Sequence, residues 1–424
     1  MSNTLNLGDG KWATKEGSLL AYNSENNNYK PLPFTFDRAS SATRVNKDGL
    51  IETVGADQPR IDYLNDSNGA LKLEPSRTNL VTYSEDFSQS DWTKGNSSIE
   101  SDTLISPSGI LNGSTLTDNA ANTIHRLRDS LSLSASTDYG LSIFAKKGTL
   151  SNIQLALINT ANSNTASRVF DLENGALGES ITVGGTLQDS KITDYGNGWY
   201  RCEITAQLGS TPNTYQITLA PQSSGNSTTG NQVTYDGDGN GNVYLWGAQL
   251  EEGSYSTSYI PTQGSAVTRL ADVCKNSGND QVINSTEGVL YAEISALAND
   301  LTERRITISD GTTSNRVAIE YTLSSNQIKG RVVSSSTTSA NMNFTASSIV
   351  DFSKIAISYK QNEFNLWING TKVATDTSGS VPIGLNELAF DNGAGNDKFN
   401  GNVKDVRVYN TALTDQELAA LTQV

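Results

Sequence analysis

Three oxygen-bearing side chains stand at alternate positions in one short glycine-rich run. Asp236, Asp238 and Asn240 occupy the first, third and fifth positions, and Gly241 follows them. This order matches the first half of a calcium-binding loop, in which glycines permit the tight turn that brings the oxygens together. The twelfth position, where a complete loop carries a bidentate glutamate, is Gly247. A complete EF-hand is therefore excluded, and any ion would need a further carboxylate from another loop.

A hairpin turn built on Asp-Gly and Asn-Gly, before a strand at 243–250, is the alternative interpretation of this run. Of the two interpretations, the turn is favoured. If calcium binds, two carboxylates imply a weak site with a Kd of roughly 10⁻⁴–10⁻³ M. No cofactor is required, and calcium is the one candidate.

Nucleophilic and zinc chemistry have few residues to work with. His125 is the only histidine, so one chain cannot build a multi-histidine zinc site. It lies in a run of alternating character at 123–128 without a Gly-x-Ser-x-Gly elbow, which favours an ordinary strand residue over a catalytic base. Cys202 and Cys274 are too few for a disulfide framework and are predicted to be free thiols. No catalytic residue is assigned.

The segments that carry these residues have the pattern of antiparallel strands. Only the C-terminus predicts a helix, where Thr414 caps a turn with Glu417 in capping-box spacing before Leu418 and Leu421. Strands this frequent, with so little helix, predict an all-β fold of sandwiches or jelly rolls. Period-2 alternation is clearest at 139–145, 153–158, 215–220, 289–294, 355–359 and 364–368.

Two seams predict three parts. Residues 1–75 form an N-terminal hairpin module that includes the hairpin 43–54 with Gly49 in its turn, and two antiparallel β-sandwiches follow at 76–265 and 266–424. The Ser/Thr/Asn-rich segments 223–230 and 334–340 are interpreted as loops or edge strands.

Composition excludes several partners. The 424 residues are 36% hydrophobic, enough for two or three domains, and the net charge is −15. A surface of this sign repels nucleic acid and anionic membranes. No apolar run approaches the ~20 residues of a membrane span. The first residues lack the basic and apolar stretches of a signal peptide, so we expect none.

The N-terminal part contains several specific runs in a fixed order. These are 36–45 (FDRASSATRV), 48–52 (DGLIE), 59–63 (PRIDY) and 73–80 (LEPSRTNL), closed by 246–251 (WGAQLE) and 259–262 (YIPT). Their order resembles a block found in bacteriophage tail-fibre, head-fibre and spike proteins with carbohydrate-binding-module-like sandwiches. The resemblance spans about 240 residues.

A second resemblance lies near the C-terminus. It rests on 364–370 (FNLWING), 399–410 (FNGNVKDVRVYN) and 412–418 (ALTDQEL). These runs resemble a hairpin strand, a closing strand and a short helix of the concanavalin A-like, laminin G-like or pentraxin-like jelly roll.

Together the resemblances imply a virion fibre or spike protein whose sandwiches bind host-surface glycans during adsorption. The N-terminal module would attach it to other virion proteins, and fibres of this resemblance are usually homotrimers. Such a protein assembles in the host cytoplasm and is located in the virion. The alternative from another class is a structural or decorating protein of capsid or tail that binds no sugar.

A polysaccharide depolymerase is the least favoured alternative. Glucanase relatives carry Glu-Ile-Asp-x-x-Glu, and the nearest run here, from Glu293, keeps only the first carboxylate. We therefore expect no enzyme activity. The glycan-binding residues stay unknown, because Trp92, Trp199, Trp246 and Trp367 lie in strand-like runs and are interpreted as core anchors rather than exposed sugar platforms.

Overall fold

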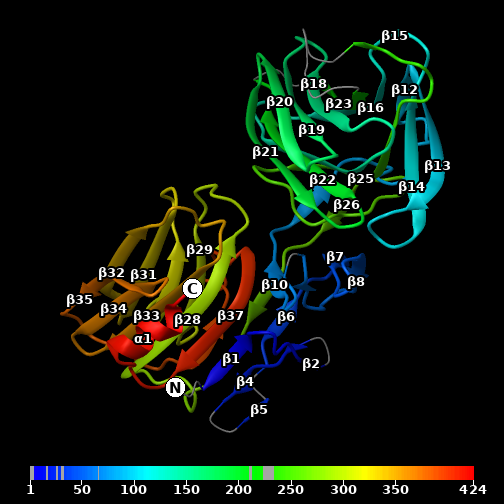
Figure 1. Cartoon of the computed structure of the whole chain (residues 1–424). Coiled ribbons are helices and arrows are strands. Elements are labelled where there is room, and N and C mark those ends of the chain that lie inside the picture. Colours follow the sequence, from blue (N-terminus) through cyan, green and yellow to red (C-terminus); the bar gives the residue numbers. More distant parts are fainter. Residues whose placement is uncertain are drawn as a thin grey trace. The chain divides into compact units, whose positions relative to one another are not determined.

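Almost every regular element in the structure is a β-strand. The computed structural model describes residues 4–15, 18–24, 27–29, 33–64, 66–209, 213–222 and 234–424. Within these residues the elements are strands joined by turns, with one α-helix at the C-terminus (Figure 1). The predicted all-β class is confirmed. The predicted loop or edge strand at 223–230 lies outside the described residues.

The chain divides into two compact units, and the division differs from the predicted one. Unit 1 contains Met1–Ser41, Val54–Pro75 and Leu270–Val424, and unit 2 contains Ala42–Thr53 and Ser76–Arg269. The structure thus corrects the separate module at 1–75, because most of those residues belong with the C-terminal sandwich.

Strand pairing explains this correction. β1 (Leu5–Gly8) and β10 (Ala70–Leu73) both pair antiparallel with β37 (Gly401–Tyr409). Leu7 opposes Val406, and both side chains are buried in one core. A strand that shares a sheet and a core with the C-terminal sandwich cannot form a module of its own.

The larger sheet of unit 1 has ten strands. Its order starts at β35, runs through β28 and β37 to β5, and places β10 and β9 beside β37. The members are β35 (Thr371–Asp376), β34 (Glu363–Ile368), β33 (Ser353–Lys360), β28 (Glu287–Ala296), β37, β1, β4 (Tyr22–Asn23), β5 (Asn28–Tyr29), β10 and β9 (Ile61–Asp62).

The second sheet of unit 1 packs against the first. Its five strands are, in order, β32 (Thr337–Thr345), β31 (Gln327–Ser334), β30 (Arg316–Tyr321), β29 (Arg304–Ser309) and β36 (Glu387–Ala389). Ile306 and Val332 from this sheet share one buried cluster with Leu290 and Ile357 from the larger sheet. The result is a two-layer jelly roll, in which β32 forms an edge as predicted for 334–340.

The helix α1 (Asp415–Thr422) closes unit 1 as predicted. The Thr414 hydroxyl accepts from the backbone N–H of Glu417 at 3.3 Å, and the Glu417 carboxylate accepts from the N–H of Thr414 at 2.9 Å. These hydrogen bonds hold the pKa of Glu417 below its ordinary value. Leu418 packs with Tyr291 and Trp367, so the helix covers the outer face of the larger sheet (Figure 1).

Unit 2 is a sandwich of two six-stranded sheets around one core. One sheet has the order β12 (Thr93–Gly95), β16 (Arg126–Leu133), β23 (Asn213–Gln222), β18 (Asn152–Asn159), β19 (Thr165–Asp171) and β20 (Ala176–Val183). The other has the order β13 (Ser97–Ile105), β14 (Leu111–Asp118), β25 (Asn242–Glu252), β17 (Tyr139–Lys147), β22 (Trp199–Gln207) and β21 (Thr186–Asp194).

Short two-stranded pairs complete each unit. In the hairpin of β7 (Ala42–Val45) and β8 (Ile51–Val54), Gly49 has a φ of +77° in the turn, as predicted. The other pairs are β2 (Thr14–Lys15) with β3 (Ser18–Leu19), β6 (Thr35–Asp37) with β27 (Val273–Lys275), β11 (Arg77–Asn79) with β26 (Val267–Arg269), and β15 (Asn122–Thr123) with β24 (Tyr235–Asp236).

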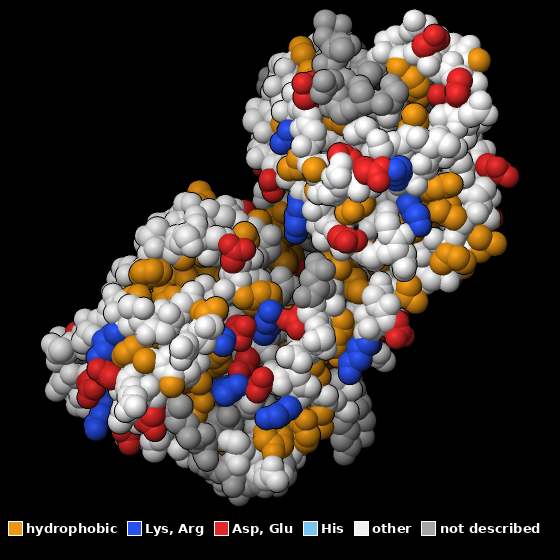
Figure 2. Space-filling view, viewed as in Figure 1, with side chains coloured by type: hydrophobic (Ala, Val, Ile, Leu, Met, Phe, Trp, Pro, Cys, Tyr) orange, Lys and Arg blue, Asp and Glu red, His pale blue; other side chains and the backbone are white. Residues whose placement is uncertain are grey.

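Surface charges are mixed rather than separated. On the face that Figure 2 shows, Lys and Arg side chains lie among Asp and Glu side chains. Lys404 pairs with Asp66, and Arg407 pairs with Asp9, both as exposed or half-buried ion pairs. Among the described residues, no helix is long and apolar enough to cross a membrane.

Candidate functional site

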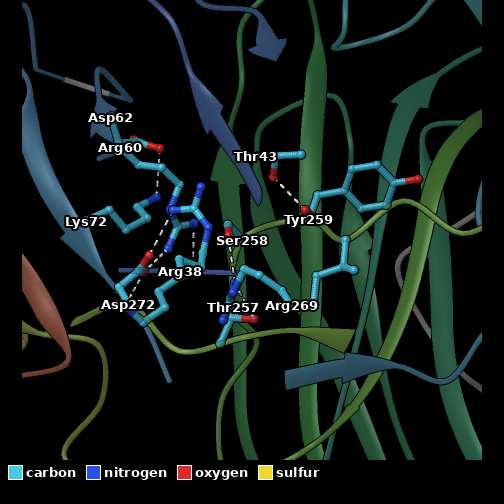
Figure 3. A network of polar contacts seen from close by, with 12 residues as sticks. Arg38, Thr43, Arg60, Asp62, Lys72, Thr257, Ser258, Tyr259, Arg269 and Asp272 are labelled. Atoms are coloured by element: carbon cyan, nitrogen blue, oxygen red, sulfur yellow. Dashed lines mark hydrogen bonds and ion pairs between the residues drawn. The ribbon is translucent and has the colours of Figure 1, made fainter. Parts of the chain in front are cut away.

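The charged residues of the N-terminal runs form a buried ion cluster in unit 1. Asp272 accepts from Arg38 Nη1 at 2.9 Å and also pairs with Arg60, which in turn pairs with Glu74 at 2.7 Å. The side chains of Arg38, Arg60 and Asp272 are fully buried. Figure 3 shows the two guanidinium groups converging on Asp272. The cluster ties the N-terminal strands to the segment at 272, so its role is structural.

The closing runs of unit 2 also have structural roles. The Gln249 side chain donates to the backbone carbonyl of Thr257 at 3.3 Å and accepts from the N–H of Ile260 at 2.6 Å. Figure 3 shows two further contacts of the same segment, from Thr43 to the Tyr259 carbonyl and from Arg269 to Ser258. The segment after β25 is thereby held against its own unit.

His125 and the two cysteines are packing residues. The His125 ring is buried, with Nδ1 2.7 Å from the Asn96 carbonyl oxygen and Nε2 3.1 Å from that of Ala121. Cys202 and Cys274 are free and buried, as predicted, and burial raises the pKa of both thiols well above the ordinary value. None of the three is exposed for chemistry.

All four tryptophans singled out from the sequence are buried, which confirms that they are not exposed sugar platforms. Trp92 lies in the sandwich core of unit 2, and Trp367 lies beneath α1. Trp246 instead contacts Phe144 and Tyr259, with ring centroids 5.2 Å and 4.6 Å away, on the outer face of its sheet. It therefore anchors the covering segment rather than the space between the two sheets.

The candidate calcium loop forms a tight turn that engages a carboxylate from another element. Asp118 lies at the end of β14. Its Oδ1 accepts hydrogen bonds from the backbone N–H groups of Gly239 and Gly241, both at 3.0 Å. Asp238 Oδ1 accepts from the N–H groups of Asn240 at 2.8 Å and of Gly241 at 3.1 Å. Asp236 lies in β24, opposite Asn122.

This geometry has the hydrogen bonds of a turn, since the carboxylate oxygens face N–H donors. Within the described ranges, no group of three or more His, Cys, Asp or Glu side chains is arranged to hold a metal ion. Asp118 is a carboxylate from another element that lies beside this run, which the sequence alone could not locate. Calcium binding at Asp236, Asp238 and Asn240 stays a prediction.

That prediction has a direct test. With a Kd near 10⁻³ M, 10 mM calcium would stabilise unit 2 by about 1.4 kcal/mol, which raises the Tm of a unit of this size by roughly 3–5 °C. Chelator should reverse the rise, and Asp238→Ala should abolish it. Identical melting curves with calcium and with chelator would leave only the turn.

Glu293 does lie beside a second carboxylate. It is directly opposite Asp405 across β28 and β37. Burial raises the pKa of Asp405 to about 6, although Arg407 lies 2.6 Å from its Oδ2. Sequence reasoning missed this pair because its members are more than a hundred positions apart. The ion pair with Arg407 gives Asp405 a structural role. The expectation that the chain is not an enzyme stays a prediction.

Unit 1 contains a polar pocket of about 330 Å³. It lies where β28 begins, β37 ends and the connection to β36 passes, since antiparallel neighbours place these ends together. Its lining is formed by Asp280, Gln281, Ile283, Asn284, Ser285, Gly384, Leu385 and Asn410.

Some lining groups hold the pocket and others are open to a ligand. Asn284 donates to the Asn410 carbonyl at 2.9 Å, and Ser285 accepts from the N–H of Leu385 at 2.9 Å, so both fix the wall. The side chains of Asp280 and Gln281 are exposed and make no hydrogen bond within the described part of the chain. A carboxylate and an amide beside apolar Ile283 and Leu385 can accept from and donate to hydroxyl groups of a small polar ligand.

The sequence held only a weak signal for this pocket. Residues 274–280 read as a polar, turn-rich segment, and residues 364–370 and 399–410 predicted the surrounding strands. The convergence of residues 280–285 with 384–385 and 410 is a tertiary contact without a local pattern.

Comparison with known proteins identifies the class of the second sandwich. Residues 292–419 match the Concanavalin A-like lectin/glucanases superfamily, so unit 1 contains a concanavalin A-like, laminin G-like domain. No protein with a curated description matches the chain.

Several solved structures are similar to parts of the chain at low identity. The CBM40 of the Ruminococcus gnavus IT-sialidase is 16% identical, with 34% of this chain and 86% of that chain covered and a TM-score of 0.29. Domain 4 of a Geobacillus stearothermophilus GH43 extracellular arabinanase is 12% identical, with 40% and 82% covered and a TM-score of 0.29. Mouse laminin alpha1 domains LG4-5 are 9% identical, with 70% and 90% covered and a TM-score of 0.23. At these scores the likenesses add no argument to the family match.

Proposed function

We propose that the laminin G-like domain of this chain binds a cell-surface glycan in the pocket beside Asp280. The observation that carries the proposal is an open carboxylate and an open amide in a 330 Å³ pocket of unit 1, whose residues 292–419 match a lectin and glucanase superfamily. Such groups can form hydrogen bonds with sugar hydroxyls, since a carboxylate accepts hydrogen bonds from neighbouring hydroxyls and an amide both donates and accepts them. A shallow polar site of this kind binds with a Kd of roughly micromolar to millimolar.

Asp280→Ala is expected to weaken glycan binding by about tenfold or more, because a hydrogen bond to a charged group contributes ~1.5–3 kcal/mol. Gln281→Ala should weaken it less, since its amide is neutral. A glycan array selects the ligand, and calorimetry then measures the Kd of each variant.

Asp351→Ala is the matched control, because this exposed carboxylate of the same unit lies outside the pocket lining. It should bind as the wild type does. An array that stays blank at high protein concentration, or equal affinity of wild type and Asp280→Ala, would contradict the proposal.

The finer proposal is a virion fibre or spike protein that displays this domain to the host during adsorption. Its support is the resemblance of residues 36–80 and 246–262 to phage fibre and spike proteins. On this proposal the chain is a homotrimer attached to other virion proteins, and its weak sites gain avidity by multivalency. Light scattering reports the trimer, and a virion micrograph with labelled protein reports head or tail.

Loss of adsorption separates this proposal from a non-binding decorating protein. Deleting 266–424 is too coarse a test, because β1 and β10 would lose their partner β37. Asp280→Ala in the full-length chain is sharper, since particles should assemble normally and adsorb less. Release of reducing ends from host glycan would instead favour the depolymerase.

A further inference from the structure

A square of four polar side chains lies on the outer face of the five-stranded sheet of unit 1. Lys329 and Arg331 of β31 point away from the core, because Ile328 and Val332 on either side of them are buried in it, and Gly330 between them faces Ile357 of the core. Across the sheet, Lys329 opposes Asn343 and Arg331 opposes Asn341 on the edge strand β32. Directly opposite side chains start about 5 Å apart and alternate ones about 7 Å apart.

Three of the four side chains have no partner within the described residues. Lys329 makes no ion pair, and neither amide group of Asn341 and Asn343 makes a hydrogen bond. Both asparagines are exposed, and Lys329 is half-buried. Lys329 and Arg331 therefore place two cations on one face of a chain with 45 acidic and 30 basic residues, and Glu320 of β30 lies directly opposite Lys329.

A buried carboxylate lies beside Arg331. Glu320 is 1% exposed, and its Oε1 lies 3.3 Å from Arg331 Nε and 3.1 Å from Arg305 Nε. The Arg331 side chain is 23% exposed. Its two terminal nitrogens make no hydrogen bond within the described residues. These nitrogens form a planar fork, the geometry that binds a carboxylate or sulfate with two parallel hydrogen bonds.

The buried neighbours on the same face carry charges of both signs. Arg316 of β30 donates to the Asn392 carbonyl at 2.6 Å and makes no ion pair among the described residues. Both oxygens of Glu320 are buried and lack a hydrogen-bond partner there. The floor therefore combines guanidinium groups that need an acceptor with a carboxylate oxygen that needs a donor.

We propose that this square, formed by Lys329, Arg331, Asn341 and Asn343, binds an anionic saccharide. The negative group of the sugar pairs with the Arg331 fork and the Lys329 ammonium, and its hydroxyls bond to the two asparagine amides. A saccharide with a carboxylate or sulfate supplies both an anion and hydroxyl donors in one residue, which a simple anion does not. The square shares no residue with the pocket beside Asp280 and does not depend on the function proposed for it.

The test measures binding of the full chain to polygalacturonate, to dextran sulfate and to neutral dextran. Affinity electrophoresis should show retardation by one or both anionic polymers and none by dextran. Lys329→Ala with Arg331→Ala should weaken the retained interaction about tenfold or more. Raising the salt from roughly 0.05 to 0.5 M should weaken it too, because exposed charges are screened.

Lys360→Ala is the matched control, since it removes an exposed cation from the other sheet of the same unit. Its binding should equal that of the wild type, and melting curves confirm that each variant is folded. Binding of polygalacturonate alone assigns a carboxylate ligand, and binding of dextran sulfate alone assigns a sulfate ligand. No binding of either polymer, or equal binding by the double variant, would overturn the proposal. Asp280→Ala should leave the binding of the anionic polymers unchanged. A failure of the proposal for the square can therefore be told apart from a failure of the proposal for the pocket.

Discussion

Asp272→Ala is expected to lower the free energy of unfolding of unit 1 by about 3–5 kcal/mol, the cost of breaking a buried ion pair from one side. The Asp272 carboxylate is fully buried and contacts both Arg38 and Arg60. Its Oδ2 also accepts from the backbone N–H of Glu74 at 2.8 Å. Removing it leaves buried positive charge without this compensation.

Neither guanidinium can relieve that charge by losing a proton. Although burial alone would lower the pKa of Arg60, the carboxylates of Glu74 and Asp272 raise it above the ordinary value. Arginine is protonated at any pH a protein tolerates. The desolvation cost therefore appears in full as lost stability.

Urea unfolding of the full chain, followed by circular dichroism, measures this loss as a shift of the unit 1 transition. Asp415→Ala is the control, because Asp415 pairs with Lys372 at 2.6 Å but its side chain is 64% exposed. An exposed pair contributes roughly 0–1 kcal/mol, so this variant should unfold nearly as the wild type does. Equal midpoints for the two variants would show that the buried cluster does not stabilise unit 1.

Local patterns in the sequence were sufficient for the fold class. Alternation predicted the strands, the Thr414 and Glu417 spacing predicted the helix, and Gly49 predicted a turn with positive φ. Each of these depends on residues within a few positions of one another. The same sequence could not show that Leu5 opposes Val408, because that contact joins strands about 400 positions apart. The separate N-terminal module was therefore an error of tertiary pairing, not of secondary structure.

The candidate sites follow the same division. The Asp236 to Gly241 run was visible because its residues are adjacent, whereas Asp118, which binds its backbone, was not. The pocket beside Asp280 and the square around Arg331 each combine separate segments. The runs that resemble phage proteins indicate only an order of segments along the chain, and only the structure shows that Arg38, Arg60 and Asp272 form one cluster.

Trp246 shows how one residue can shift the faces of a strand. Val243 and Leu245 face the core of unit 2 before it, and Ala248 and Leu250 face the core after it. The pairing of β17 with β25 has a bulge between Trp246 and Gln249, where β25 contains one residue more than β17. Gly247 lies in this bulge with a φ of +65°. The face occupied by Trp246 therefore depends on a backbone conformation that favours glycine.

Gly247→Ala is expected to destabilise unit 2 by about 3 kcal/mol. The left-handed conformation costs a non-glycine residue roughly 1–2 kcal/mol. A Cβ at this position would lie 2.9 Å from Phe144 Cδ2 and 3.3 Å from Tyr259 Cε2. Phe144 is 1% exposed and packs edge-on against Tyr195, so it cannot move aside without repacking, which costs ~1–3 kcal/mol.

Gly196→Ala separates the two contributions. Gly196 has a φ of +79° in the turn between β21 and β22, and a Cβ there would meet no atom within 4 Å. Gly196→Ala should therefore lower the free energy of unfolding only by the cost of the left-handed backbone conformation, about 1 kcal/mol, and lower the Tm of unit 2 by roughly 2–4 °C. Gly247→Ala should shift it about two to three times as far, with altered fluorescence from Trp246. Equal shifts for the two variants would mean that the ring contacts with Phe144 and Tyr259 give way, and that the bulge is held by backbone conformation alone.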